Sequence, residues 1–166
     1  VENVQDITET KEMEEEMAEA RREQRNILNA IRNGIVYINR DKEIQSVNEA
    51  AADAAGMKQE EMVGKVCHEA FFHSGTPCEG CPVMETLQTG EPMEAEMPAP
   101  DGGTIHVFGE PVRGEDGELI GAIENFMDIT ERKKAVRTIK ETMTGIAEGD
   151  LSVEIEEDFS GDYADI

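Results

Sequence analysis

The sequence predicts an α+β domain, in which one five-stranded antiparallel sheet carries short helices on one face and is flanked by N- and C-terminal helices of the coiled-coil type. Two strand-like runs come first and three come later, with short helical segments between the two groups. Turns rich in Gly, Asn and Asp separate neighbouring runs, as antiparallel strands require. Long helical segments with a repeating apolar pattern lie on both sides.

The composition is that of an aliphatic and strongly acidic protein. Of its 166 residues 38% are apolar, only 4% are aromatic, and none is tryptophan. Fifteen basic residues stand against 38 acidic residues, which gives a net charge of −23. Such a surface repels phosphate backbones and anionic lipid, so we expect no nucleic-acid partner and no direct membrane contact.

Cysteine content and hydropathy bear on the compartment. The chain has no run of about 18 apolar residues, as a membrane-spanning helix would need, and shows no secretory signal. Three cysteines are an odd number, which does not suit the disulfide framework of a secreted domain. A cytoplasmic location is therefore expected, although a longer parent protein could still carry a membrane anchor.

The first nine residues resemble a later stretch of the chain. Residues 1–9 and residues 123–131 share six of nine positions, including Asp-Ile-Thr-Glu, and both lead into charged helical sequence. A repeat at this distance is typical of tandem domains. We therefore expect residues 1–9 to be the last strand and turn of a preceding repeat.

A linker helix is predicted over residues 10–33, which are rich in Glu, Met, Ala, Arg and Gln and contain neither Pro nor Gly. Alternating spacings of four and three residues mark a coiled-coil seam at Met13, Met17, Ala20, Gln24, Ile27 and Ile31. The same rhythm returns at Ile129, Arg132, Val136, Ile139, Met143 and Ile146. Because the pattern lies on both sides of the domain, we favour a homodimer through parallel helices over helices that pack on their own domain.

Between these helices, turn residues divide the chain into short elements. Asn48 is a suitable N-cap, and Gly56, Gly64 and Gly90 are suitable helix ends. The expected elements are strands at 35–38 and 43–47, helices at 49–55, 58–63 and 82–89, and strands at 91–98, 104–112 and 118–128.

This pattern resembles a PAS domain, the small sensory module of bacterial and archaeal signalling proteins. The resemblance is carried by Gly-Ile-Val-Tyr-Ile at 34–38, Val-Asn-Glu-Ala-Ala at 47–51, Gly64-Lys65, Asp-Gly-Gly at 101–103, Gly-Ala-Ile at 121–123 and Asp-Ile-Thr-Glu-Arg at 128–132. It places the domain at residues 34–130. It also implies that Asp128, Ile129 and Thr130 couple the sheet to the outgoing helix, with Asp128 as a cap.

The segment after the domain, residues 131–166, resembles a signalling helix and the first part of a HAMP signal-relay domain. Residues 146–152 read Ile-Ala-Glu-Gly-Asp-Leu-Ser, like the junction between the first HAMP helix and its connector. Residues 161–166 resemble the start of the second HAMP helix. A plain linker helix with a tail is the alternative.

The stretch from Gly64 to Pro82 holds all three cysteines, Cys67, Cys78 and Cys81, and two histidines, His68 and His73. A Cys-x-x-Cys pair with a third cysteine nearby is a common arrangement for a soft metal, and His73 is a better fourth ligand than His68, which adjoins Cys67. An iron–sulfur cluster or zinc would suit this set. A thiol redox switch and simple structural packing are the two alternatives. The same loop also resembles that of a cysteine-bearing subset of PAS domains.

Other cofactors and sites fit less well. Pro82 after the pair excludes a c-type haem, and a b-type haem would have to use one of the same histidines or cysteines as its axial ligand. His106 is expected on a sheet face. The interior cavity is expected to be lined by Met57, Met62, Phe71, Phe72 and Met84.

The function expected from these features is a non-catalytic sensory module. It would sense redox state, oxygen, a metal or a small ligand, and relay the change through the outgoing helix to downstream domains of a chemoreceptor or sensor histidine kinase. A structural dimerisation module with a loop held by zinc or a disulfide is the alternative, and a thiol oxidoreductase is a third hypothesis.

Overall fold

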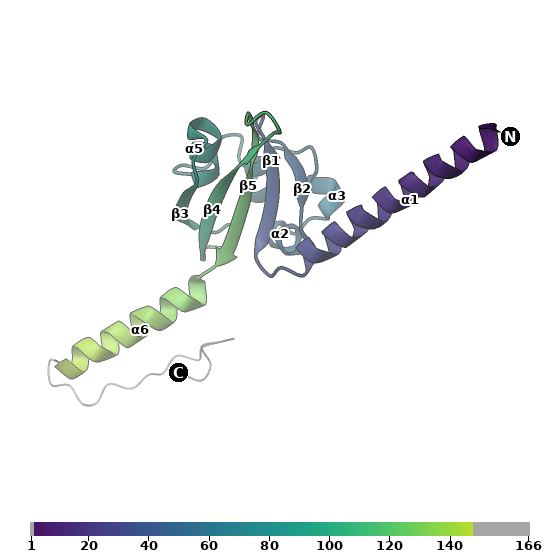
Figure 1. Cartoon of the computed structure of the whole chain (residues 1–166). Coiled ribbons are helices and arrows are strands. Elements are labelled where there is room, and N and C mark those ends of the chain that lie inside the picture. The colour runs from purple at the N-terminus through teal and green to yellow at the C-terminus, as the bar shows by residue number, and fades with distance from the viewer. Residues whose placement is uncertain (1, 148–166) are drawn as a thin grey trace.

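The computed structural model describes residues 2–147, with side chains from Thr10 onward. Figure 1 shows a central sheet from which a long helix leaves at each end of the chain. The elements are α1 (Glu2–Asn29), β1 (Gly34–Asn39), β2 (Ile44–Val47), α2 (Glu49–Ala55), α3 (Gln59–Met62), α4 (Cys67–Phe72), α5 (Pro82–Thr89), β3 (Met93–Pro98), β4 (Thr104–Arg113), β5 (Leu119–Asp128) and α6 (Thr130–Ala147).

The five strands form one antiparallel sheet in the order β2-β1-β5-β4-β3. This confirms the predicted fold class, with β5 in the centre. Alternate residues of the strands point to the helix-covered face, where Val36, Ile38 and Val107 are at most 2% exposed. They pack with Met62 of α3 and Val83 of α5 into one core. The last strand, β5, contributes Ala122 and Phe126 to this core and leads into α6 after one residue.

Local signals explain the short helices. The side chain of Asn48 accepts a hydrogen bond from the Ala51 amide at the start of α2 (3.0 Å), and Gly56 closes that helix in the left-handed conformation with φ of 63°. Pro82 begins α5, and Gly90 ends it with φ of 71°. The helix α4 differs from the sequence prediction, in which Cys67–Phe72 belong to the cysteine loop.

Asn48 also fixes the junction between α1 and the sheet. It is 1% exposed, and its Oδ1 accepts a second hydrogen bond from the amide of Ile35 (2.9 Å). Its Nδ2 donates to the carbonyl oxygens of Leu28, Ile31 and Asn33 at 3.1, 3.3 and 2.9 Å. Because these carbonyls find a partner outside the helix, α1 ends at Asn29 and not at Asn33 as predicted.

Two further sequence predictions need correction. Residues 2–9, expected as a strand, lie in α1; no strand pairs with them among the described residues, and a helix satisfies its backbone groups internally whereas a lone strand does not. Ile129 was assigned to a coiled-coil seam but is 5% exposed, because it packs into the domain where α6 begins.

The two long helices meet the sheet at the same end (Figure 1). Gly34, the first residue of β1 after α1, pairs with Phe126 near the end of β5. Asn33 and Asn125 link the same region through a side-chain hydrogen bond of 3.1 Å.

None of the helices within residues 2–147 has the length and apolar character needed to cross a membrane.

Candidate functional site

A cavity of about 310 Å³ lies between the sheet and the helices α2 and α4. Apolar side chains form much of its wall, with Phe71 and Phe72 from α4 and Ile105 and Phe126 from the sheet. The rings of Phe71 and Phe126 pack edge to face, with centroids 5.6 Å apart. This size and this apolar lining are typical of a site for a small molecule.

Three carboxyl groups also line the cavity: Asp101 from the turn before β4, and Glu124 and Asp128 from β5. Glu124 is the unusual one, because it is only 9% exposed. Burial raises its pKa to about 7, and the hydrogen bond from the Cys67 thiol to Oε2 (3.4 Å) acts in the opposite direction. The wall of this ligand-sized cavity therefore contains a carboxyl group whose pKa lies near neutral pH.

Sequence reasoning missed Glu124, although a signal was present. Ala122 and Phe126 flank it at a distance of two residues in β5, and both are buried. Since alternate residues of a strand share one face, an acidic residue between two core positions must point inward. The local apolar–acidic–apolar pattern could have identified it.

The three cysteines are brought together around a second, much smaller pocket of about 20 Å³, which His68, Lys42 and Met84 also line. All three are free thiols. Burial is the main cause that raises each thiol pKa: that of Cys67 lies well above its usual value, that of Cys78 is raised, and that of Cys81 reaches about 11. The negative charge of Glu124 acts in the same direction on all three. Thiols held in this way stay protonated near neutral pH and are weak nucleophiles.

The predicted metal site does not fit this arrangement. Within residues 10–147, no group of three or more His, Cys, Asp or Glu side chains is placed to hold a metal ion. His73, the favoured fourth ligand, is exposed at the end of α4 with φ of 51°, and the buried histidine beside the cysteines is His68. An iron–sulfur cluster or zinc at these residues stays a prediction that the geometry does not support.

The other predicted residues are distributed over several places. Phe71 and Phe72 line the 310 Å³ cavity. Met62 is fully buried in the core, Met57 packs against the core, and Met84 lines the cysteine pocket. His106 lies on the outer face of β4, where its Nε2 is 3.3 Å from the Glu94 carboxylate.

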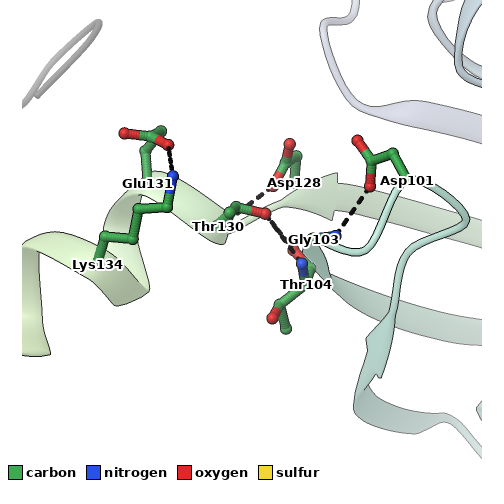
Figure 2. Close-up of polar contacts among 7 residues, drawn as sticks. All are labelled: Asp101, Gly103, Thr104, Asp128, Thr130, Glu131 and Lys134. Atoms are coloured by element: carbon green, nitrogen blue, oxygen red, sulfur yellow. Dashed lines mark hydrogen bonds and ion pairs between the residues drawn. The ribbon is translucent and has the colours of Figure 1, made fainter.

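The Asp-Ile-Thr sequence joins three elements through hydrogen bonds (Figure 2). The Thr130 amide donates to Asp128 Oδ1 (2.7 Å), and the Thr104 amide donates to Thr130 Oγ1 (2.9 Å). The Ile129 amide donates to the Thr104 carbonyl (2.9 Å). The first turn of α6 is therefore fixed to the ends of both β4 and β5, and Asp128 belongs both to this network and to the cavity wall.

Comparison with known proteins places this chain among signalling proteins. It is 29% identical over 152 residues to the signal transduction histidine-protein kinase AtoS of Escherichia coli, which covers 79% of this chain and 24% of that protein. It is 32% identical over 118 residues to a probable C4-dicarboxylate sensor kinase of Halalkalibacterium halodurans, which covers 71% of this chain and 20% of the relative. The chain thus spans about a quarter or less of the length of these relatives.

The fold has a counterpart among solved structures. The PAS domain of a protein from Colwellia psychrerythraea matches with a TM-score of 0.54 at 19% identity, covering 66% of this chain and 97% of that structure. The sequence profile of the PAS domain matches residues 32–131, well over half of the chain. With a five-stranded antiparallel sheet, short helices over one face and Asp-Ile-Thr at the start of the outgoing helix, this chain belongs to the PAS domain family, the sensory domains of signalling proteins such as sensor kinases.

Proposed function

We propose that this chain is the sensing and relay segment of a signalling protein, which binds a small molecule in the 310 Å³ cavity and passes the change to α6. One observation carries this proposal: Asp128 lines the cavity and also accepts the Thr130 amide at the start of α6. A ligand that moves Asp128 changes the cap of the outgoing helix directly.

The proposed output is a change in a parallel homodimer. Met13, Met17 and Ile27 on α1 and Val136, Met143 and Ile146 on α6 are all at least 51% exposed. Apolar side chains repeated along one stripe of a long helix are stabilised when a second helix covers them. In a parallel pair, Glu16 and Arg21 would occupy the g and e positions that form an interhelical ion pair.

The proposed destination of the signal is a histidine kinase, because two relatives are sensor kinases. A chemoreceptor is the other destination predicted from the sequence. The HAMP-like segment expected at 146–152 and 161–166 lies almost entirely outside the described residues. The proposed relay therefore runs from the cavity through Asp128 and Thr130 along α6.

A chimera tests this function. Residues 1–147 would be fused to the kinase core of AtoS, and autophosphorylation would be measured with the cavity partly filled by Ala99→Leu. We expect Ala99→Leu to change the rate of autophosphorylation. When Thr130→Val is also present, we expect Ala99→Leu to change this rate much less, as for a coupled pair in a double-mutant cycle. Gln88→Leu, at an exposed position of α5, is the control. Equal rates for wild type, Ala99→Leu and the control would contradict the proposal.

A thiol-based input is the second candidate, because Cys67, Cys78 and Cys81 line one pocket and Cys67 contacts Glu124 of the cavity. Its test is the free-thiol count before and after diamide treatment, together with the absorption spectrum and the iron and zinc content of anaerobically purified protein. A fall in thiols that changes kinase output in the chimera supports this input. Cys→Ser variants that lose stability but keep the wild-type output favour a structural loop instead.

A further inference from the structure

The cavity wall is acidic as well as apolar. Asp101, Glu124 and Asp128 line it, and no Lys, Arg or His side chain of the described chain does so. Figure 2 shows the carboxylates of Asp101 and Asp128 on the same side of the strand ends. Both of these residues are exposed whereas Glu124 is buried, so the carboxyl groups extend from the mouth of the cavity to its interior.

The inner carboxyl group has bonding capacity left for a ligand. The hydrogen bond that Glu124 accepts from Cys67 uses Oε2, and no residue in the described part of the chain bonds Oε1. In that same part, every fully enclosed side-chain nitrogen or oxygen has a hydrogen-bond partner. Oε1 is therefore not fully enclosed, and Glu124 is one of the residues that line the cavity.

The apolar wall adds a second source of attraction for a positive charge. Phe71, Phe72 and Phe126 line the same cavity. The face of an aromatic ring attracts a cation, and the gain rises when the cation is removed from water. A charged ammonium group near Glu124 and a short apolar or aromatic tail against these rings would match both parts of the wall.

Other ligand classes fit less well. A bare metal ion needs three or more ligands at short distance, and within residues 10–147 no such group exists. An anion would enter a cavity lined by three carboxyl groups on a chain of net charge −23. A neutral molecule would gain no charge–charge attraction from these carboxyl groups.

We propose that the cavity binds a small organic cation, an ammonium ion that carries a short apolar or aromatic group, with Glu124 as its counter-ion. The binding follows from the cavity alone, whereas its signalling consequence rests on the function proposed above. A cation that enters past Asp128 attracts the carboxylate of this residue, whose Oδ1 accepts a hydrogen bond from the Thr130 amide. This attraction weakens the hydrogen bond and thereby loosens the start of α6.

Three probes of similar shape and different charge test the proposal on the whole chain. Isothermal titration would compare 2-phenylethylamine, 2-phenylethanol and phenylacetate at about pH 8, above the pKa of Glu124 of about 7. Choline and its uncharged analogue 3,3-dimethylbutan-1-ol form a second pair. We expect each cation to bind at least about tenfold more tightly than its neutral counterpart and the anion to bind most weakly.

Variants assign the binding to the cavity. Glu124→Gln keeps the shape of the side chain and is expected to weaken the cations at least about tenfold while the alcohols are little affected. Glu110→Gln, at an exposed position of β4, is the matched control and should bind as wild type does. Cations that bind no more tightly than the alcohols, or as tightly to Glu124→Gln as to wild type, would overturn the proposal. If Glu124→Gln does not fold, the proposal is decided by the affinities of the wild-type protein for the cationic, neutral and anionic probes.

Hydrogen–deuterium exchange over residues 130–147 separates this inference from the proposed function. Charge-selective binding without any change in the exchange of α6 would support the site and contradict the relay. A response of the chimera to Ala99→Leu without selective binding of cations would support the relay and overturn the ligand class.

Discussion

Glu124 is an acidic residue in an unusual environment, since it is only 9% exposed. Its carboxyl group is held in the wall of the cavity, where burial raises its pKa from the usual 4.5 to about 7. A folded state that holds this proton more tightly than the unfolded chain is stabilised below about pH 4.5 and loses that contribution as the pH rises to about 7. The side chain therefore makes the domain sensitive to pH around neutrality.

The first prediction concerns this stability. Between about pH 5 and about pH 8, we expect the free energy of unfolding of the wild type to fall by as much as about 3 kcal/mol more than that of Glu124→Gln, which has no proton to lose. Urea denaturation of both proteins at several pH values measures the difference. If the free energies of unfolding of the wild type and Glu124→Gln change with pH in parallel, burial does not raise the pKa of Glu124.

At the scale of elements, the connection between β4 and α6 depends on close approach. A Cβ atom at Gly103 would lie 2.5 Å from Thr130 Oγ1, the atom that accepts the Thr104 amide. We predict that Gly103→Ala turns the Thr130 side chain away, costs about 1 kcal/mol for the lost hydrogen bond, and speeds amide exchange in the first turns of α6. Gly75→Ala, which would meet nothing within 4 Å, is the control. Unchanged exchange in Gly103→Ala would mean that Thr130 does not hold the helix start.

The helix α1 carries a separate prediction about the proposed dimer. In the proposed parallel dimer, Glu16 of each helix faces Arg21 of the other, so the pair occurs twice. Arg21→Glu replaces each of these pairs by two acidic residues that repel each other. We expect the variant to weaken association about tenfold and the double variant Glu16→Arg/Arg21→Glu to restore it. Sedimentation equilibrium measures both. Equal weakening by the single and double variants would argue against a parallel pairing in this register.

For the whole molecule, net charge opposes association. Each chain carries a net charge of −23, so two copies repel each other, and we expect this repulsion to outweigh the attraction of a few interhelical ion pairs in the proposed dimer. We predict that the dimer becomes tighter when ionic strength rises from about 0.05 M to about 0.5 M, because the Debye length shortens to about 4 Å. Sedimentation at both salt concentrations is the measurement. A dimer that dissociates on addition of salt would show that ion pairs dominate the interface.

The elements of the fold were largely predictable because they depend on local signals. Alternating apolar residues gave the strands, and Asn48, Gly56 and Gly90 gave the limits of α2 and α5. The end of α1 was not predictable in this way, because it depends on the Nδ2 of Asn48, which lies some 20 residues further along the chain. The helix α4 was not predictable because it has only six residues and its N-cap residue, Val66, makes no side-chain cap hydrogen bond, so the local helix signal is weak.

The sequence by itself determined most of the strands and short helices, since periodicity, turn residues and capping act over a few neighbouring residues, and its motifs, including the Asp-Ile-Thr link, resemble those of PAS domains. Only the tertiary structure decided which side chains form the site. It brought Glu124 into the cavity with Phe71, gathered the three cysteines around a separate pocket as protonated thiols, and left His73 outside. These outcomes depend on burial and on contacts between residues far apart in the chain, because a pKa and a ligand set are properties of the folded environment and not of the residue type.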